Sequence, residues 1–304
     1  MIVASAMVLD ALIGDPKWLW SKIPHPITLI GRLIGWVDRR FNCGPNRRAH
    51  GVLLVVALLI GSIGIGFGPH LFSYGWVLEI ALGAILIAQR SLVSHVKEVA
   101  TQLAESIEKG QLAVSMIVGR DTKDMNETAV TRAAIESAAE NLSDGVIAPV
   151  FWFTLAGLPG LIAYKAINTA DSMVGYLTDR HRDFGWAAAR LDDVLNWAPA
   201  RITAGLISLC CRPVPELAEI QTDARKHRSP NAGWPEAAMS RALGIALSGP
   251  RTYHGVLEEH SYVNEHGRKD VTPADVDTCI TVLWQAWRLT LAALLVWAAI
   301  QISA

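Results

Sequence analysis

The sequence predicts an all-α, polytopic integral membrane protein with about five transmembrane helices. Of its 304 residues, 51% are apolar and only 18% are charged. Its mean hydropathy of +0.29 is high for a chain that folds in water. The charges are also unevenly placed, because Glu79 is the only formally charged residue between Gly51 and Gln89. These three observations point to segments that lie within a bilayer.

The first apolar stretch is too long for one membrane span. As a continuous helix, residues 51–89 would measure about 58 Å, roughly twice the 30 Å hydrocarbon thickness of a bilayer. Glycine, proline and serine residues interrupt the stretch between Gly66 and Gly75, so it predicts two antiparallel spans. Glycines of the first span are expected to pack closely against a neighbouring span: Gly61, Gly64 and Gly68.

The remaining apolar stretches follow the same logic, because they carry at most one formal charge each. The predicted spans are 51–68, 76–89, 145–164, 194–211 and 284–304. The polar loops between them are 15–50, 90–144, 165–193 and 212–283, and residues 1–304 are expected to form a single integral membrane domain. Residues 1–13 are too short to span comfortably and include Asp10. They predict neither a cleaved signal nor a secure span.

The positive charges indicate which loops face the cytoplasm. Lysine and arginine total 7 in loop 15–50, 6 in 90–144, 4 in 165–193 and 8 in 212–283. The positive-inside rule places the three richest loops in the cytoplasm. Loop 165–193 then falls on the opposite side, unless the proline- and glycine-interrupted segment 145–164 is re-entrant. Both topologies stay open.

Charge and cysteine content exclude several functional classes. The 28 acidic and 27 basic residues leave a net charge of -1, which provides no polycationic face for nucleic acid. The four cysteines show no C-x-x-C spacing, so neither a disulfide framework nor a zinc site is expected. The sequence also lacks a phosphate-loop motif, a dinucleotide-binding glycine motif and a nucleophile elbow. Any nucleotide chemistry therefore requires an unfamiliar site.

Outside the spans, the chain is predicted to be helical almost throughout. Apolar residues recur with a 3.6-residue period across 90–109. Residues 112–118 suit a short strand or a further turn. Asp124 or Asn126 then caps a helix that runs to about residue 141.

The helix before the third span carries the first candidate site. One basic and three acidic side chains follow each other at intervals of four residues: Arg132, Glu136, Glu140 and Asp144. They therefore line one face of the helix. Carboxylates repel one another at that spacing, which suits either a solvated outer face or a divalent cation. Mg²⁺ is the candidate ion, because it binds a few carboxylate oxygens together with substrate phosphates.

A second candidate begins where the third span ends. Lys165, Asn168 and Asp171 are three residues apart, so they lie along one side of a helix, with Ser172 next to Asn168. Charged groups are costly where lipid surrounds them, so an ammonium and a carboxylate that face inward indicate function. A snorkelling lysine followed by a capping Asn/Asp pair is the alternative.

Further polar groups border the fourth span. Asp192 and Asp193 directly precede it and suit either a helix cap or additional metal carboxylates. Arg201 lies within it, and an intramembrane arginine is expected to face the bundle and to contact a carboxylate or an anionic ligand.

Turn motifs also precede a largely apolar helix near the N-terminus. They are, in order, Gly14-Asp15-Pro16, Pro24-His25-Pro26 and, on the helix, Arg32. His25 between two prolines is held in an extended conformation and is able to titrate near neutral pH. An exposed loop histidine fits the same pattern.

Taken together, these motifs resemble those of a known enzyme family. They are GDP at 14–16, PHP at 24–26, IGR at 30–32, GRDT at 119–122, ES at 136–137, ENLSDG at 140–145, YKAINTADSM at 164–173 and SPNAGWPE at 229–236. Their identity and order closely resemble the CobD/CbiB family, the adenosylcobinamide-phosphate synthases of cobalamin biosynthesis. The similarity extends from about residue 8 to about residue 290, and several long motifs in one order make it specific.

The resemblance implies a multi-pass enzyme of the bacterial inner membrane, surrounded by the lipid bilayer. The reaction that it implies joins adenosylcobyric acid to (R)-1-aminopropan-2-ol or its O-phosphate through an amide bond, with ATP as co-substrate, Mg²⁺ as cofactor and the corrinoid as substrate. Amide formation needs an activated carboxylate, such as an acyl phosphate, before an amine attacks. A homo-oligomer, or an assembly with other membrane enzymes of the cobalamin pathway, is compatible with the resemblance.

The resemblance also assigns expected roles. Mg²⁺ and the phosphates are expected to be held by Glu136, Glu140, Asp144 and Asp171. Charge on the transferring phosphoryl group is expected to be neutralised by Arg120 and Lys165. The amide or the corrin propionate is expected to be oriented by Asn141 and Asn168, and the proton of the attacking ammonium is expected to pass to a carboxylate, Asp121. The substrates are expected to contact Asp15, His25, Arg32, Asp192 and Arg201.

Two other functional classes remain open. A related membrane family, that of the AmpE sensor-like proteins, has no established ligase activity and suggests a binding or signalling protein. A transporter is the second alternative, since Gly/Pro-broken segments with buried charges mark substrate paths. The concentration of ionisable residues in long polar loops favours an enzyme.

Overall fold

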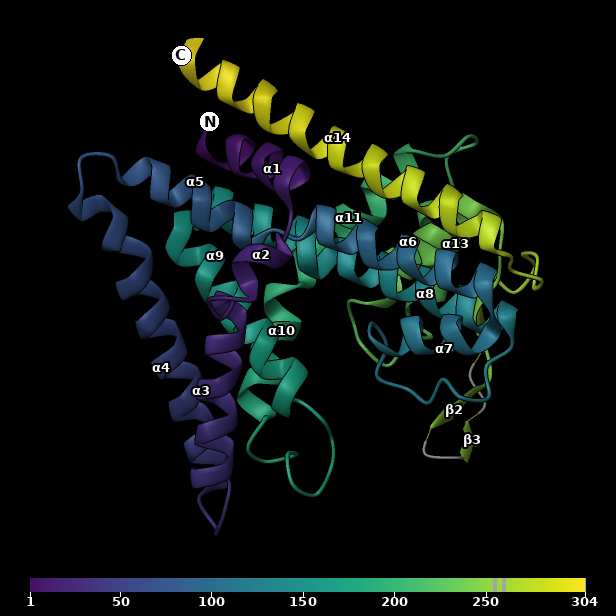
Figure 1. Ribbon diagram of the computed structural model, residues 1–304, viewed down its shortest axis with the longest axis horizontal. Helices are drawn as coiled ribbons and strands as arrows, with labels where there is room; N and C mark the ends of the chain where they lie inside the picture. The colour runs from purple at the N-terminus through teal and green to yellow at the C-terminus, as the bar shows by residue number, and fades with distance from the viewer. Residues whose placement is uncertain (254–255, 259–260, 304) are drawn as a thin grey trace. The chain divides into compact units, whose positions relative to one another are not determined.

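The computed structural model covers residues 1–304, and the structure is described for all of them except 254–255, 259–260 and 304. The described chain is almost entirely helical (Figure 1), as the sequence predicts. Its elements are α1 (Ile2–Ile13), α2 (Lys17–Trp20), α3 (Pro26–Phe41), α4 (Arg47–Phe67), η1 (Gly68–Leu71), α5 (Gly75–Leu86), α6 (Gln89–Glu105), α7 (Ile107–Ser115), α8 (Glu127–Leu142), η2 (Ser143–Ile147), α9 (Ala148–Val174), α10 (Trp186–Leu195), α11 (Trp197–Leu209), α12 (Leu217–Ala224), α13 (Gly233–Leu243), β1 (Leu247–Ser248), β2 (Arg251–Tyr253), β3 (Val256–Glu258), β4 (Tyr262–Val263) and α14 (Pro273–Ser303).

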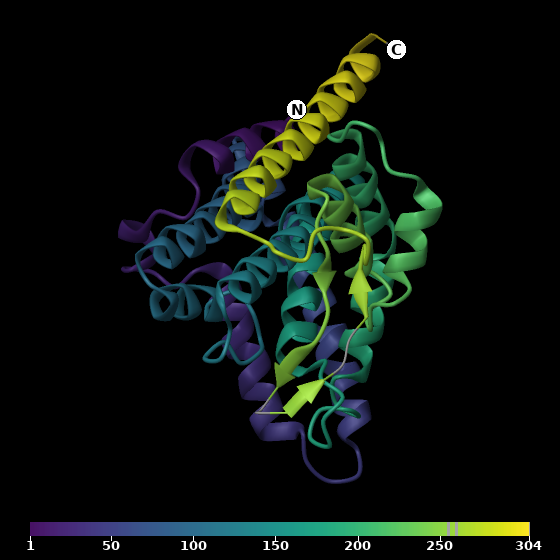
Figure 2. The same cartoon turned by 90° about the vertical axis from the view of Figure 1, so that its right-hand side faces the viewer.

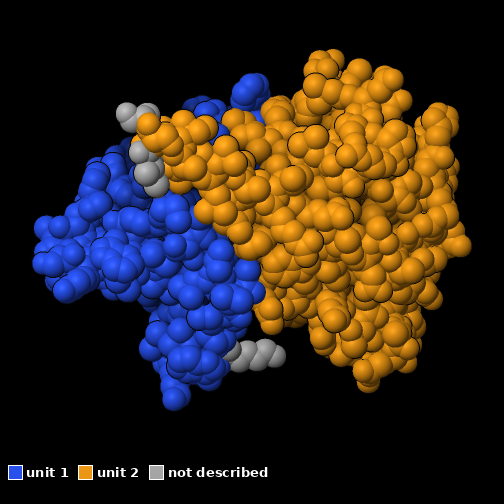
Figure 3. Space-filling model, turned by 90° about the horizontal axis from the view of Figure 1, so that it is seen from above, with its two compact units in different colours: residues 1–88, 144–197 blue, residues 89–143, 198–304 orange. Residues whose placement is uncertain are grey.

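The chain folds into two compact units, each drawn from two separate stretches of sequence. Unit 1 comprises residues 1–88 and 144–197, and unit 2 comprises residues 89–143 and 198–304 (Figure 3). The chain therefore passes between the units three times, and neither unit is a contiguous piece of sequence. The expectation of a single membrane domain stays a prediction.

Unit 1 is built around α9. Helices α3, α4 and α10 all pack against it, and α1 packs against α5 (Figure 1). The core joins Ile34 of α3, Leu54 and Leu58 of α4, Ile167 of α9 and the connecting residue Phe184. Where such helices lie in lipid, close packing holds them together, because the surrounding acyl chains are as apolar as leucine.

A glycine allows α4 to approach α9 closely, but it is not one of the three that the sequence indicated. A Cβ atom on Gly66 would lie 2.4 Å from the Cα of Pro159. No described atom lies within 4 Å of such a Cβ at Gly61, Gly64 or Gly68. The prediction of close packing at those three glycines is therefore wrong, because they lie on a different face of the helix.

Helix α9 contains a break that the sequence only hinted at. Ala156 has φ -129° and ψ 17°, and Gly157 has φ 62° and ψ -162°. The second conformation belongs almost exclusively to glycine. Two helical segments therefore meet at Gly157, and the second, from Leu158 to Val174, carries the predicted site residues Lys165, Asn168 and Asp171.

Unit 2 is a helical cluster with two small β-pairs. Helices α6, α7, α8, α13 and α14 pack on one another, around the buried residues Val99, Leu103, Val114, Val130 and Ala134. The strands pair antiparallel as β1 with β4 and β2 with β3 (Figure 2).

Four helical segments of the described chain are long and apolar enough to cross a membrane. They are Arg47–Leu71, Gly75–Glu105, Glu127–Val174 and Pro273–Gln301. They contain the predicted spans 51–68, 76–89 and 145–164 and most of 284–304, whose last residue lies outside the described chain. The chain is thus a polytopic helical membrane protein. Residues 1–13 form only the short apolar helix α1.

The predicted span 194–211 is not one continuous helix. Helix α10 ends at Leu195 and α11 begins at Trp197. The intervening Asn196 donates its backbone N–H to the carbonyl of Asp192 and its side-chain amide to the carboxylate of the same residue. Helix α11 has 13 residues, a length of about 20 Å, which is too short for the hydrocarbon layer.

One further local prediction differs from the structure, and for residues 112–118 the second of the two predicted alternatives is confirmed. The expected helix at 90–109 is divided at Ser106, whose hydroxyl accepts a hydrogen bond from the N–H of Lys109 at 3.3 Å and begins α7. Residues 112–118 complete α7 and a turn rather than a strand. The next helix agrees with its prediction, because the Asn126 side chain accepts from the N–H of Ala129 at 2.9 Å and begins α8.

Candidate active site

A cluster of polar side chains gathers inside unit 1. The second part of α9 supplies Tyr164, Lys165 and Asn168, the π-helical turn η2 supplies Asp144, and α10 supplies Asp192. Residues 20 to 50 positions apart thus meet because α9 packs against α10 and because η2 leads directly into α9.

Hydrogen bonds join the members of this cluster. The Asn168 side-chain amide donates to Asp144 Oδ2 at 3.5 Å and to Asp192 Oδ1 at 3.2 Å. Tyr164 donates its hydroxyl to Asn196 Oδ1 at 2.9 Å, and Asn196 in turn donates to Asp192 Oδ2 at 2.9 Å. One amide therefore holds two carboxylates near each other, and a second amide fixes the ring of Tyr164.

The Lys165 ammonium lies in the field of three carboxylates. Asp144, Asp192 and Asp15 all act on its charge, while its side chain is half-buried. Three carboxylates around one ammonium leave an excess of negative charge when all are ionised. Such a site attracts a cation, or the cationic part of a ligand.

Asp192 is buried and its proton affinity is altered. Burial raises the pKa of its carboxyl, and the charge of Asp193 adds to the rise. The hydrogen bonds from Asn168 and Asn196 and the charge of Lys165 oppose it, but burial prevails. A carboxylate with a raised pKa is a better proton acceptor than an exposed one.

His25, which precedes α3, lies near Lys165 and Asp15 of the same cluster. Its Nδ1 accepts the N–H of Ile27 at 3.2 Å and begins α3, and its Nε2 lies 3.7 Å from Asp15 Oδ1. Burial lowers the pKa of His25, and the nearby Lys165 charge lowers it further, whereas Asp15 and a hydrogen bond to the Ile85 backbone oppose the shift. The ring is therefore neutral at neutral pH, with its proton on Nε2.

Other predicted site residues gather in unit 2. Glu136 of α8 accepts from Arg120 Nη2 at 2.8 Å and from the backbone N–H of Ser248 at 2.6 Å. The Arg120 and Glu136 side chains are only 9% and 7% exposed. Ser248 has φ 62°, a strained conformation that is often found at functional sites.

A cavity of about 190 Å³ adjoins this ion pair. It is lined by Arg120, Asp121, Asp124, Met125, Asn126, Ala129, Arg132, Ser248 and Pro250. Arg132 and Glu136 do not pair with each other across the helix face, because Arg132 donates to the carbonyls of Ala246 and Lys269. Asn141 donates its side-chain amide to the backbone carbonyl of Ser137 at 2.9 Å.

The predicted Mg²⁺ ligands are divided between the two units. Glu136 and Glu140 belong to unit 2 and Asp144 and Asp171 to unit 1. Glu140 is exposed, and Asp171 lies against Gly175 at the end of α9. Among the described residues, no group of three or more His, Cys, Asp or Glu side chains is placed to hold a metal ion.

The donor set of unit 1 nevertheless fits Mg²⁺. Proteins commonly hold this ion through one or two carboxylates, and substrate phosphates complete its coordination. Asp144 and Asp192 provide two such carboxylates, and both contact Asn168. The assignment of Glu136, Glu140 and Asp171 as metal ligands stays a prediction.

Two predicted substrate contacts lie elsewhere. Arg201 donates to Asn231 Oδ1 at 2.8 Å and to the Pro230 carbonyl at 3.2 Å, and its guanidinium lies 4.7 Å from the centre of the Trp234 ring. These partners are an amide, a carbonyl and an aromatic ring, and the predicted contact with a carboxylate or an anionic ligand stays a prediction. Arg32 is exposed on α3.

Sequence reasoning missed two members of the unit 1 cluster, Tyr164 and Asn196. Tyr164 directly precedes Lys165 in the YKAINTADSM motif, and Asn196 is one turn beyond Asp192. These positions beside Lys165 and Asp192 were the available signal, because a buried polar side chain next to a candidate site requires a hydrogen-bond partner.

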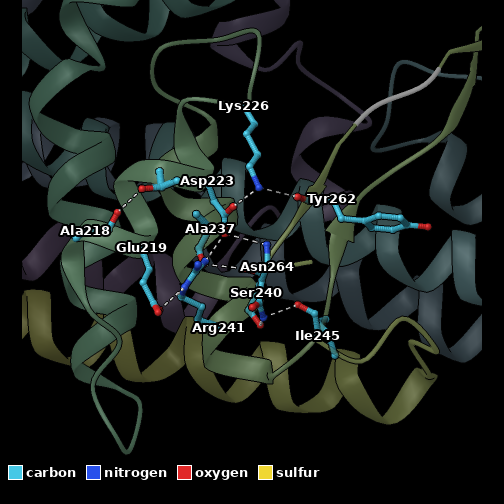
Figure 4. Close-up of polar contacts among 11 residues, drawn as sticks. Ala218, Glu219, Asp223, Lys226, Ala237, Ser240, Arg241, Ile245, Tyr262 and Asn264 are labelled. Carbon is cyan, nitrogen blue, oxygen red and sulfur yellow. Dashed lines mark hydrogen bonds and ion pairs between the residues drawn. The ribbon is translucent and has the colours of Figure 1, made fainter. Parts of the chain in front are cut away.

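A denser polar cluster in unit 2 is structural. Arg241 of α13 donates to Asp223 Oδ2 at 2.6 Å and to Glu219 Oε2 at 3.2 Å, and Lys226 approaches Asp223 Oδ1 at 2.7 Å (Figure 4). Asn264 also donates its backbone N–H to Asp223. These contacts tie α12 to α13 and leave little capacity on Asp223 for a ligand.

Comparison with known proteins supplies an independent observation. The family model described as CobD/Cbib protein matches residues 3–283. The chain is 45% identical over 309 residues to "Cobalamin biosynthesis protein CobD" of Brucella anthropi, covering 95% of this chain and 94% of that protein. It is 43% identical over 295 residues to the protein of the same name from Halalkalibacterium halodurans, with 92% and 91% covered. No solved structure is detectably similar.

The match covers most of both units and every motif noted above. The chain belongs to the CobD/CbiB family of cobalamin biosynthesis proteins.

Proposed function

We propose that this protein is an ATP- and Mg²⁺-dependent ligase that joins adenosylcobyric acid to (R)-1-aminopropan-2-ol or its O-phosphate. The reaction forms one amide bond and takes place at the bacterial inner membrane, in a multi-pass protein. The observation that carries the proposal is the Lys165 ammonium among Asp15, Asp144 and Asp192, inside a member of a cobalamin biosynthesis family.

The chemistry requires two bond exchanges. In the first, a carboxylate oxygen of adenosylcobyric acid attacks the γ-phosphorus of ATP, an O–P bond forms, and ADP leaves with the electrons of the broken bond. In the second, the amine nitrogen attacks the acyl carbon, the C–N bond forms, and inorganic phosphate leaves. One proton of the nitrogen must pass to a base.

Four residues of the cluster have a role in this scheme. Lys165 neutralises charge on the transferring phosphoryl group. Asn168 holds Asp144 and Asp192 in place, and these two carboxylates would hold Mg²⁺, which supplies charge neutralisation at the phosphates when bound. As an alternative to holding Mg²⁺, Asp192, whose pKa burial raises, would accept the amine proton.

The unit 2 residues enter the proposal separately. Arg120 and Asp121 line the cavity beside the Arg120–Glu136 pair. Their assignment to phosphoryl stabilisation and to proton acceptance is tested by Arg120→Gln and Asp121→Asn. Loss of activity in Asp121→Asn with activity kept in Asp192→Asn would assign the base to Asp121 instead of Asp192.

The decisive experiment compares variants in the purified, detergent-solubilised protein. The reaction contains adenosylcobyric acid, aminopropanol phosphate and Mg-ATP, and mass spectrometry measures the amide product. We expect Lys165→Met to lower kcat/KM by about 100-fold or more, because stabilisation of developing charge is lost. Lys97→Met is the matched control, since Lys97 is exposed on α6.

The outcomes separate the alternatives. Full activity in Lys165→Met, in protein that keeps the wild-type melting temperature, would remove the unit 1 cluster from the reaction. A folded wild-type protein that binds the corrinoid and forms no product would instead favour a binding protein or a transporter.

A further inference from the structure

An apolar groove runs between α3 and α4 of unit 1. Its volume is about 430 Å³, within the roughly 300–1,000 Å³ range of ligand sites. It is lined by Leu33, Val37, Phe41, His50, Leu53, Leu54, Ala57 and Leu58. On α3 the lining residues recur every four positions, so they form one stripe that faces α4. The proposed function uses none of these residues.

The groove lies along a membrane-crossing segment. Helix α4 belongs to the candidate span Arg47–Leu71. Large apolar side chains beside the groove are exposed on both helices, among them Leu29, Leu33 and Trp36 on α3 and Leu53 and Val56 on α4. In a bilayer the exposed apolar side chains of α4 would meet acyl chains, so lipid is available to enter the groove.

Basic side chains surround one end of the groove. His50 lines that end and its Nδ1 lies 2.8 Å from the carbonyl of Phe41. The Arg40 guanidinium lies 5.8 Å from the centre of the Phe41 ring. Phe41 lines the groove, so Arg40 lies at the end of the groove that Phe41 forms.

The acidic groups near this end are already matched. Asp38 pairs with Arg180 at 2.6 Å, Asp183 with Arg47 at 3.6 Å, and Asp179 with Arg182 at 3.8 Å. Three further arginines, Arg39, Arg40 and Arg48, form no ion pair with any described residue. The end of the α3–α4 hairpin therefore has a surplus of positive charge.

We propose that this groove is a binding site for an anionic phospholipid. One acyl chain occupies the groove between α3 and α4, and the Arg40 guanidinium at its mouth holds the headgroup phosphate. Basic pockets beside membrane helices select anionic headgroups in this way, and each arginine near a membrane surface strengthens the attraction to anionic lipid about fivefold.

Lipid retention in native mass spectrometry tests the site. The full chain is exchanged into mixed micelles that contain phosphatidylglycerol and phosphatidylcholine with identical acyl chains, and the retained lipids are counted. We expect the wild-type protein to retain phosphatidylglycerol in preference. Arg40→Gln is expected to lower that preference about fivefold, whereas Arg225→Gln, at an exposed arginine of unit 2, leaves it unchanged.

A second pair of variants tests the groove itself. Val37→Trp fills the groove and is expected to abolish the retained lipid. Val52→Trp places the same side chain at an exposed position of α4 outside the lining of the groove. We expect this variant to retain the lipid. Equal retention of the two lipids by the wild-type protein would overturn the proposal. Unchanged lipid retention in Val37→Trp would also overturn it. A wild-type dimer that Val37→Trp converts to a monomer would overturn it as well and would assign this face to a second copy of the chain.

Discussion

At the scale of single residues, the environment of each polar side chain decides what it can do. Asp15, Asp144 and Asp192 all act on one ammonium in unit 1, whereas Glu136 accepts hydrogen bonds from the Arg120 guanidinium and a backbone N–H. A carboxylate with strong fixed partners contributes to stability, while one that shares a half-buried lysine is still able to respond to a ligand. This difference is why the unit 1 cluster carries the proposed chemistry.

The lowered pKa of His25 makes stability depend on pH in a defined direction. Burial keeps the ring neutral in the folded protein, whereas the unfolded chain binds a proton near pH 6.5. The contribution of His25 to the free energy of unfolding is therefore complete above about pH 6.5 and is lost as the pH falls through the lowered, folded-state pKa.

The variant His25→Asn tests this dependence, because asparagine retains the ability to cap α3. Between about pH 7.5 and pH 5.5, the melting temperature of the wild-type protein is expected to fall more steeply than that of the variant. Parallel pH dependences, measured by intrinsic fluorescence in detergent, would mean that His25 titrates alike in the folded and unfolded chain.

At the scale of elements, the break in α9 places the cluster. Gly157, with φ 62° and ψ -162°, redirects the chain before the segment that carries Lys165 and Asn168. Gly157→Ala is expected to lower the free energy of unfolding by about 1–3 kcal/mol, because other residues are strained in this conformation. Gly64→Ala is the control, since a helical glycine with open space around it is expected to gain about 0.4–1 kcal/mol. Equal effects of the two substitutions would contradict the assigned conformation.

The Asp223 cluster makes a second prediction at this scale. Burial by itself raises the pKa of Asp223, but hydrogen bonds from Lys226, Arg241 and Asn264 outweigh burial and lower it. Its stabilising contribution is thus present above the unfolded pKa of about 3.8 and is lost as the pH falls through the lower, folded-state value.

Removal of this charge is expected to loosen the contact between α12 and α13. Asp223→Ala should lower the free energy of unfolding by about 3 kcal/mol at neutral pH, because Arg241 is left buried without its main partner. Asp277→Ala, at an exposed position of α14, should have little effect. Chemical denaturation of both variants at neutral and acidic pH measures the difference, and a difference that persists below the pKa would point to packing instead of charge.

Helix positions were predictable where local signals decide them. Asn126 has the side chain of a helix cap, and it begins α8 as expected. The split of the predicted span 194–211 depends on Asn196, which bonds to Tyr164 from a distant part of the chain. Periodicity within a short window contains no information about such a partner.

The candidate site shows the same limit. Spacing placed Lys165 and Asn168 on one helix face, and they do share one cluster. Asp15, Asp144 and Asp192 come close to Lys165 because α9 packs against α10 and because of the position of the N-terminal turn. No local sequence pattern specifies this packing. Glu136 was expected to face a metal ion, yet its oxygens meet Arg120 and Ser248, a residue more than a hundred positions away.

At the scale of the whole molecule, the chain is a helical membrane protein of the CobD/CbiB family, and its two units each hold part of the predicted set of residues. Unit 1 contains the carboxylates around Lys165, and unit 2 contains the cavity beside Arg120. The residues that the proposed ligase reaction uses lie between Asp15 and Asp192, within the family match that covers residues 3–283.

The most direct measurement follows an oxygen atom through the reaction. Adenosylcobyric acid with oxygen-18 in its reacting carboxylate is incubated with the wild-type protein, aminopropanol phosphate and Mg-ATP. The proposed acyl phosphate predicts the amide product together with one oxygen-18 atom in inorganic phosphate, because the carboxylate oxygen leaves on phosphorus. Absence of the amide product from folded protein would contradict the ligase function, and label found in AMP instead of phosphate would contradict the acyl phosphate.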